Sequence, residues 1–276
     1  IRLTAEANGW SKHGPRLISR FLDGYKDALG DPKLTPPTPT VAARFLGSFR
    51  EDRLAALDAA DELMAALDFP LAELQAAIDR YAKPLAENDP KLGGAFFKVK
   101  RAGNLHIGIG SALDSKYLLR VEGPSPSPQD DVVLEVKEVR KLDAIPCLNS
   151  SWTNDPFRIL VGSARIAYRP FRYLGYTVFK DQAYWVHAWT DNYFQVQADR
   201  SFQSVKELDG LVYDAGVQLG RGHPYLVATP LDTQLRQALL AQLDRLRGKL
   251  EREIVVLAEL TKQAWISFSI VVTSKR

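Results

Sequence analysis

The chain has 276 residues, of which 46% are hydrophobic and 25% charged, with a formal net charge of +3. These values are typical of a soluble globular protein of one large or two modest domains, and no apolar run approaches the roughly 18 residues that cross a membrane. The basic residues are dispersed, which argues against a nucleic-acid partner, and the single cysteine, Cys147, excludes an intrachain disulfide and favours a cytoplasmic location.

Residues 1–92 are predicted to be helical. Apolar residues recur every fourth position in the first helix, at Leu17, Phe21, Tyr25 and Leu29, and this spacing forms one face of a helix. Two Ala- and Leu-rich segments, 50–70 and 71–84, repeat the pattern. The chain begins without methionine inside an apparent helix, from which we expect a preceding segment.

Residues 93–195 are predicted to form a small antiparallel sheet, because apolar residues now alternate with polar ones. Three strands are expected within 95–110, 116–123 and 132–139. A helix over 156–168 follows, and then a hairpin over 173–189 that turns at Lys180, Asp181 and Gln182.

Residues 196–276 return to a helical pattern, with helices expected over 204–223 and 232–262. The apolar end of the chain, residues 264–276, is interpreted as a core or sheet segment. Helices, then a sheet, then helices predict an α+β protein with two lobes, built from the regions 1–92, 93–195 and 196–276.

A glycine-rich turn joins the first two predicted strands and contains Gly108, Gly110 and Ser111. Glycines let backbone N–H groups approach phosphate oxygens, and Lys137 on the third strand could add a positive charge to the same phosphates. A hairpin also needs glycine for steric reasons alone. Lys137 lies on the strand face opposite Leu134 and Val136, so a solvated outer lysine is the alternative.

The stretch "KVKRAGNLHIGIGSALDSKYLLRVEG…DDVVLEVKEV" resembles a bacterial family of unknown function that carries "GVGSVGTRxYxxLLxG…LQVKEA". That family is distantly similar to aminoglycoside phosphotransferases and protein kinases. "DAGVQLGRGHPY", residues 214–225, is similar to the family's "GxxLAxAHA". The resemblance covers about residues 95–225 and implies a circularly permuted, two-lobed, protein-kinase-like fold, in which 1–92 completes the catalytic lobe and 93–195 is the nucleotide-loop lobe.

The resemblance implies a kinase-like phosphotransferase that uses ATP and Mg²⁺ on an acceptor the sequence does not identify. Gly108, Gly110 and Ser111 would then hold the nucleotide phosphates, and Lys137 would neutralise them. The family's "HGDxHxxN" and "DxNDFDE" motifs, which precede this region, do not occur in these residues. No catalytic residue is therefore assigned, this chain alone is expected to be inactive, and the missing motifs are expected on a preceding segment or a second chain.

Two departures from the kinase pattern favour another interpretation, a non-catalytic, pseudokinase-like module that binds a ligand or a protein. Leu113 replaces a third glycine, and Glu135 stands where kinases carry a small residue beside adenine. Arg158 and Arg165 of the helix over 156–168 could pair with Glu135 or contact phosphate, or form a solvated helix face. A third interpretation keeps the hairpin and lysine for stability alone.

The histidines and Cys147 show no metal-ligand spacing, so no metal site is assigned. His187 lies in "HAWTDN", which has the letters of a phosphotransferase catalytic loop without its spacing.

Overall fold

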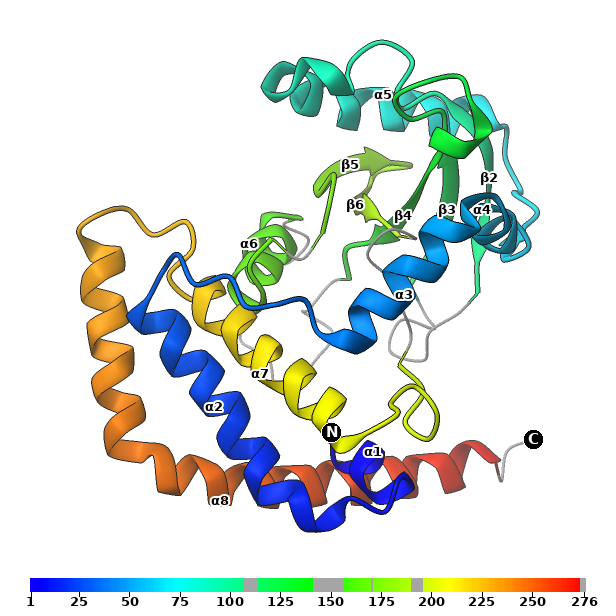
Figure 1. Ribbon diagram of the computed structural model, residues 1–276. Helices are drawn as coiled ribbons and strands as arrows, with labels where there is room; N and C mark the ends of the chain where they lie inside the picture. The colour runs from blue at the N-terminus through cyan, green and yellow to red at the C-terminus, as the bar shows by residue number, and fades with distance from the viewer. Residues whose placement is uncertain (107–113, 141–155, 170, 190–195, 274–276) are drawn as a thin grey trace. The chain divides into compact units, whose positions relative to one another are not determined.

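The computed structural model describes residues 1–106, 114–140, 156–169, 171–189 and 196–273. The protein is α+β, as the sequence predicts. It divides into two compact units (Figure 1): a helical unit of residues 1–44, 165–168 and 196–276, and a sheet unit of residues 45–164 and 169–195. Each unit has hydrophobic clusters of its own.

The sheet unit contains a six-stranded antiparallel sheet in the order β1-β2-β3-β4-β6-β5. The three strands expected between residues 95 and 139 and the hairpin expected over 173–189 are confirmed. The strands are β1 Met64–Ala65, β2 Val99–Leu105, β3 Lys116–Val121, β4 Val132–Glu138, β5 Gly175–Phe179 and β6 Gln182–Ala188.

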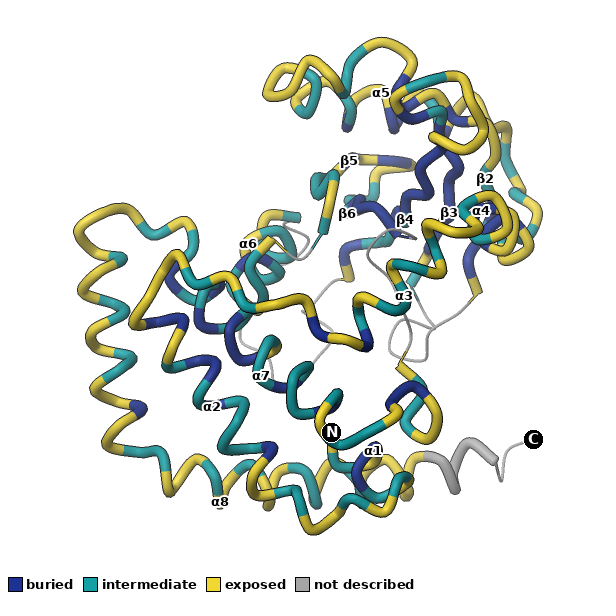
Figure 2. The backbone as a smooth tube through the Cα atoms, viewed as in Figure 1, coloured by how far each residue is buried: buried dark blue, intermediate teal, exposed yellow. Residues whose placement is uncertain are grey.

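One face of this sheet is covered by α5 (Leu71–Asn88). Alternate residues of β3 and β4 point to this face, and both strands are deeply buried (Figure 2). The shared core includes Leu74, Ile78 and Tyr81 of α5, Tyr117, Leu119 and Val121 of β3, and Leu134 and Val136 of β4.

The opposite face is covered in part by α4 (Arg53–Asp61), whose first turn is capped by the Asp52 side chain accepting from Ala55 N–H at 3.2 Å. Leu57 and Ala60 of α4 pack against Leu118, Val133 and Trp189 of the sheet. The prediction of one uninterrupted helical segment over 50–70 is wrong. α4 ends at Asp61. The two residues of β1 then form strand hydrogen bonds with the end of β2 in place of helical ones.

A buried ion-pair cluster joins α4 to this face. The Arg120 guanidinium contacts Asp131 Oδ2 at 2.7 Å, Asp61 Oδ2 at 2.9 Å and Asp58 Oδ1 at 2.9 Å. The side chains of Arg120, Asp61 and Asp131 are only 11%, 7% and 2% exposed. Lys100 reaches the other oxygen of Asp131 at 2.5 Å. Charges taken out of water are costly unless they are paired, so the cluster fixes where α4 sits on the sheet, although Asp61 Oδ1 is buried without a hydrogen-bond partner among the described residues.

The β5–β6 hairpin turns at Lys180 and Asp181, as predicted. Both residues have positive φ, 48° and 60°, and Phe179 pairs with Gln182 across the turn. Two-residue hairpin loops with positive φ at both central positions match the right-handed twist of the strands.

We expect Asp181→Gly to raise the free energy of unfolding by up to about 1 kcal/mol, because glycine adopts positive φ without a Cβ clash. Asp181→Val should lower it, since a β-branched residue is a genuine outlier in this region. Thermal unfolding of the two variants checks this, and equal shifts for both would contradict it.

The remainder of the sheet unit includes most of α6 (Pro156–Ile166), which confirms the helix expected there. α3 (Thr40–Glu51) crosses the boundary between the two units.

The helical unit contains α1 (Arg2–Ala7), α2 (Gly14–Gly30), α7 (Val205–Gly222) and α8 (Leu231–Thr273). The start of α7 is capped: Ser204 Oγ accepts from Glu207 N–H at 3.4 Å, and Glu207 Oε2 accepts from Gln203 N–H, just before the cap, at 2.9 Å. α2 lies along α7 (Figure 1), and Gly216 of α7 sits against the α2 backbone.

The interpretation of residues 264–276 as a core or sheet segment is wrong. α8 continues to Thr273, and Trp265 and Phe268 are 60% and 53% exposed. Within the part of the chain that the structure describes, no helix combines the length and apolar character needed to span a bilayer.

Candidate functional site

Lys137 lies on β4, a central strand of the sheet. Its register partners are Lys116 on β3 and Trp185 on β6. Because Lys116 is the first residue of β3, Lys137 stands at the end of the sheet where the β2–β3 connection emerges. Gly108, Gly110 and Ser111, in that connection, lie outside the described residues.

The side chain of Lys137 shares a face with Glu135, as the two-residue period of a strand requires. The intervening residue, Val136, is buried in the core with α5. Glu138 belongs to the α5 side as well, where its Oε2 accepts from Ser115 N–H at 3.0 Å. The lysine therefore occupies the face opposite α5. We call this the lysine face and define it by its residues Lys116, Glu135, Lys137, Trp185 and His187.

Glu135 is held by His187. Its Oε2 lies 3.2 Å from His187 Nε2, and the two side chains are 15% and 4% exposed. His187 Nδ1 lies 2.8 Å from the Ala188 carbonyl oxygen. Oxygen atoms of Glu135 and Ala188 thus face both ring nitrogens, which fixes the orientation of the imidazole.

Aromatic rings surround this pair. Trp185 and Phe171 lie against His187, with ring centroids at 4.5 and 4.2 Å and interplanar angles of 32° and 37°. Lys137 Nζ is 6.0 Å from the centre of the Trp185 ring, at the outer limit of a cation–π contact. The rings fix the orientation of His187 and form an apolar border beside Lys137.

Lys116 is the residue that sequence reasoning missed. It is a lysine with only 5% of its surface exposed. The pKa of Lys116 is lowered, mainly by burial. Lys137 also lowers it, whereas Glu135 and Asp114 act in the opposite direction. A lysine buried next to another lysine marks a site of positive potential.

Asp114 and Arg140 lie at the same end of the sheet. Arg140 Nε and one terminal guanidinium nitrogen both lie 2.8 Å from Asp114 Oδ1. Taken together with the lysine face, these residues carry net positive charge: Lys116, Lys137 and Arg140 outnumber Asp114 and Glu135. Glu138, on the other face at the same end of the sheet, balances this excess, so the excess of positive charge is confined to the face that carries Lys137.

The two arginines considered as partners for Glu135 bind elsewhere. Arg158 donates to the Arg140 carbonyl oxygen at 3.0 Å, and Arg165 donates to the His223 carbonyl oxygen at 3.0 Å. The side chain that meets Glu135 is His187, which lies in "HAWTDN" and which the sequence suggested only as a weak catalytic candidate.

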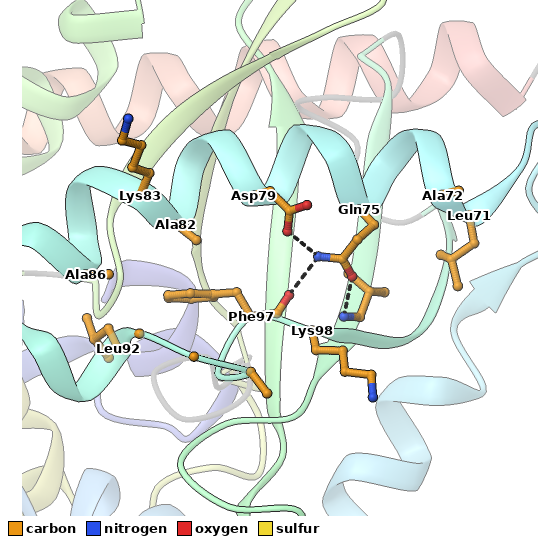
Figure 3. A pocket seen from close by; sticks show the side chains of 14 residues that line it. Leu71, Ala72, Gln75, Asp79, Ala82, Lys83, Ala86, Leu92, Phe97 and Lys98 are labelled. Atoms are coloured by element: carbon orange, nitrogen blue, oxygen red, sulfur yellow. Dashed lines mark hydrogen bonds between the residues drawn. The ribbon is translucent and has the colours of Figure 1, made fainter.

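A groove of about 800 Å³ runs between α5 and residues 92–99 (Figure 3). Gln75 crosses it: its Nε2 donates to Asp79 Oδ1 at 2.7 Å and to the Phe97 carbonyl oxygen at 3.3 Å, and its Oε1 accepts from Val99 N–H at 2.7 Å. Gln75 thus satisfies the backbone where β2 begins. The polar groups of this groove hold the fold, and Lys137 does not line it.

Among the residues whose placement the structure gives, no three His, Cys, Asp or Glu side chains gather in a way that could hold a metal ion. No family model matches the chain, and neither the curated proteins nor the solved structures that were searched include a match.

Proposed function

We propose that this chain is the nucleotide-binding portion of a kinase-like phosphotransferase and that Lys137 contacts the nucleotide phosphates. The observation that carries the proposal is the position of Lys137. It lies on the strand after the glycine-containing hairpin, at the hairpin's end of the sheet, on a face of net positive charge.

The order of elements along the chain also supports the proposal. A hairpin with a glycine-rich connection comes first, the strand with Lys137 follows, and α6 and the β5–β6 hairpin come next. Protein kinases likewise place a glycine loop over the phosphates and a lysine on the third strand, followed by a helix. A permuted, two-lobed kinase-like fold is the architecture we propose on this basis and on the sequence resemblance.

Glu135, the residue that departs from the kinase pattern, has a partner within the protein. The sequence places the Glu135 carboxylate two residues before Lys137. An unpartnered carboxylate at this position would repel phosphate. His187 Nε2 lies 3.2 Å from that carboxylate, so Glu135 is held by a contact within the protein.

In this proposal Gly108, Gly110 and Ser111 of the β2–β3 connection bind phosphate oxygens through backbone and hydroxyl groups. ATP is the proposed nucleotide, and Mg²⁺ would neutralise its phosphates when bound. The described residues include no group of His, Cys, Asp or Glu side chains that could hold a metal ion, so we assign none of them to Mg²⁺. The acceptor and the catalytic residues would come from a segment or a second chain that carries the missing motifs.

One observation favours a non-catalytic binding module as the second candidate. In protein kinases a glutamate of the helix after the lysine strand holds the lysine in place. α6 contains no aspartate or glutamate. A pseudokinase-like module would need only the phosphate contacts and not this ion pair.

The experiment is calorimetric titration of the full chain with ATP and Mg²⁺, comparing the native protein with Lys137→Ala. We expect the substitution to weaken binding about tenfold or more, because a charge-assisted contact to phosphate is lost. Lys98→Ala is the matched control, since the Lys98 side chain is 69% exposed and lies outside the lysine face. Binding that Lys137→Ala leaves unchanged would contradict the proposal.

An assay of phosphoryl transfer with the same protein distinguishes the phosphotransferase from the binding module. Phosphoryl transfer that appears when a polypeptide carrying the missing motifs is added supports the phosphotransferase. Nucleotide binding without transfer under those conditions supports the binding module.

A further inference from the structure

We propose that the second half of α8 is an interface through which two copies of this chain associate, with the two helices antiparallel and crossing at Ala264. The contact surface on each copy consists of Leu257, Leu260, Ala264 and Phe268, which we call the α8 stripe. The α8 stripe belongs to the helical unit and the lysine face to the sheet unit, so the interface is separate from the proposed function.

The α8 stripe continues an apolar seam that already packs helix against helix. Leucines recur along α8 at steps of three, four or seven residues, the period of a coiled-coil seam, at Leu239, Leu243, Leu246, Leu250, Leu257 and Leu260. Leu243 packs in a cluster with Leu22 and Leu29 of α2. Farther along, the seam emerges from the protein: Leu243 is 3% exposed, Leu250 36% and Leu257 65%. Such a seam suits the side chains of a second helix, which the described residues do not supply beyond Leu250.

α1 lies on the other side of this half of α8 (Figure 1). Glu259 contacts Arg2 at 2.5 Å, and Lys262 contacts Glu6 at 2.9 Å. At about 100° per residue, Glu259 and Lys262 point to the side opposite the α8 stripe. They are the only charged residues in the sequence from 254 to 268, so the stripe faces outward without charge along its whole length.

This lack of charge favours a protein helix over a lipid surface. Helices that lie on membranes carry many Lys and Arg residues on the polar face that borders the apolar one, and these attract anionic lipids. Over the length of the α8 stripe the only basic residue is Lys262, which Glu6 already binds. Lys249 and Arg252 precede the stripe and alternate with two glutamates, Glu251 and Glu253.

The α8 stripe is complementary to a second copy of itself. Ala264 lies between two large side chains, Leu260 and Phe268, four residues away on either side. In an antiparallel pair centred on Ala264, Leu260 of each copy therefore meets Phe268 of the other, and the small alanines let the two backbones approach.

Glu253 decides between the two orientations. It occupies the seam position between Leu250 and Leu257. A parallel pair would place Glu253 opposite Glu253 of the other copy, where like charges repel. In the antiparallel pair the two carboxylates lie about 33 Å apart along the helix axis, at a rise of about 1.5 Å per residue.

The test is sedimentation velocity of the full chain over a range of micromolar concentrations. We expect a dimer that dissociates reversibly on dilution. Leu260→Glu should weaken dimerisation at least about tenfold, because the two-fold axis places a carboxylate in the apolar contact twice. Leu231→Glu is the matched control and should leave the dimer unchanged, since Leu231 begins the same helix, is 58% exposed and lies off the seam.

Cysteine cross-linking in a Cys147→Ser background tests the orientation. Ala264→Cys should form a disulfide between copies on mild oxidation, because a pair centred at this residue brings the two Cα atoms within the roughly 7 Å that a disulfide spans. Leu257→Cys should not, since its two copies lie about 21 Å apart along the axis in the antiparallel pair. Equal cross-linking at both positions indicates a parallel pair and overturns the antiparallel arrangement.

A native protein that stays monomeric, or a dimer that Leu260→Glu leaves intact, overturns the interface. A monomer that co-sediments with vesicles of phosphatidylcholine and phosphatidylserine, and loses this binding in Leu260→Glu, assigns the α8 stripe to lipid instead. Far-UV circular dichroism establishes that each variant is folded. If Leu260→Glu does not fold, Leu257→Gln, at a more exposed position, decides the question by the same measurement.

Discussion

Replacing Arg120 by methionine is expected to lower the free energy of unfolding of the sheet unit by roughly 3–5 kcal/mol. Asp61 and Asp131 would remain almost fully buried and would lose the buried guanidinium, so that each keeps one more exposed cation, Arg101 at 3.3 Å and Lys100 at 2.5 Å respectively. An uncompensated buried charge costs more than the pair contributes when it is intact, so the loss comes mainly from the carboxylates left behind.

Arg101 is the matched control. It is the register partner of Arg120 and also contacts Asp61, at 3.3 Å, but its side chain is 58% exposed. Arg101→Met should therefore cost less than about 1 kcal/mol, as exposed ion pairs do. The two arginines share a strand pair and one carboxylate, and they differ in burial and in the further contacts that Arg120 makes with Asp58 and Asp131.

Urea unfolding followed by hydrogen exchange of individual peptides measures these effects and assigns them to the sheet unit. Arg120→Met combined with Asp61→Leu and Asp131→Leu should recover much of the lost stability, since apolar residues then replace the charges. Similar losses for Arg101→Met and Arg120→Met would contradict the role given to burial.

The strands and their faces could be predicted from the sequence because they depend on local pattern. Tyr117, Leu119 and Val121 alternate, and this alternation alone assigns them to one face. It also assigns Lys116 and Arg120 to the opposite face, so a signal for Lys116 was present in the sequence. The sequence prediction relied on the glycines before this strand and on backbone contacts to phosphate, and it did not include Lys116.

Contacts between distant parts of the chain could not be predicted in this way. The contact between Glu135 and His187 exists because β6 follows a separate helix and hairpin strand and then pairs with β4. No local pattern states which strand lies next to β4. The same holds for Arg120, whose three carboxylate partners come from α4 and from the segment before β4.

The end of α8 shows where propensity misleads. Residues 264–276 are rich in β-branched and aromatic residues, which favour strands. Their helical penalty is less than about 1 kcal/mol per residue, and extending an existing helix adds a hydrogen bond for each residue. The helix already formed by Leu231 and the residues after it therefore continues through Trp265.

Gly216→Ala is expected to destabilise the helical unit by about 2 kcal/mol or more. A Cβ at this position would lie 2.0 Å from the Phe21 carbonyl oxygen and 2.9 Å from the Tyr25 nitrogen. Both are backbone atoms of α2, so the contact can be relieved only by moving one helix away from the other. Alanine's higher helix propensity, about 1 kcal/mol, is too small to compensate.

Gly210 in the same helix provides the control, because a Cβ there meets nothing within 4 Å. Gly210→Ala should raise the free energy of unfolding by about 0.5–1 kcal/mol, so the two substitutions are expected to have opposite signs. Hydrogen exchange of α2 and α7 peptides measures both. If Gly216→Ala stabilises as Gly210→Ala does, the close approach of α2 and α7 is wrong. If it destabilises, this pair of helices is held together by backbone contacts that only glycine permits, and larger residues at 216 should cost progressively more.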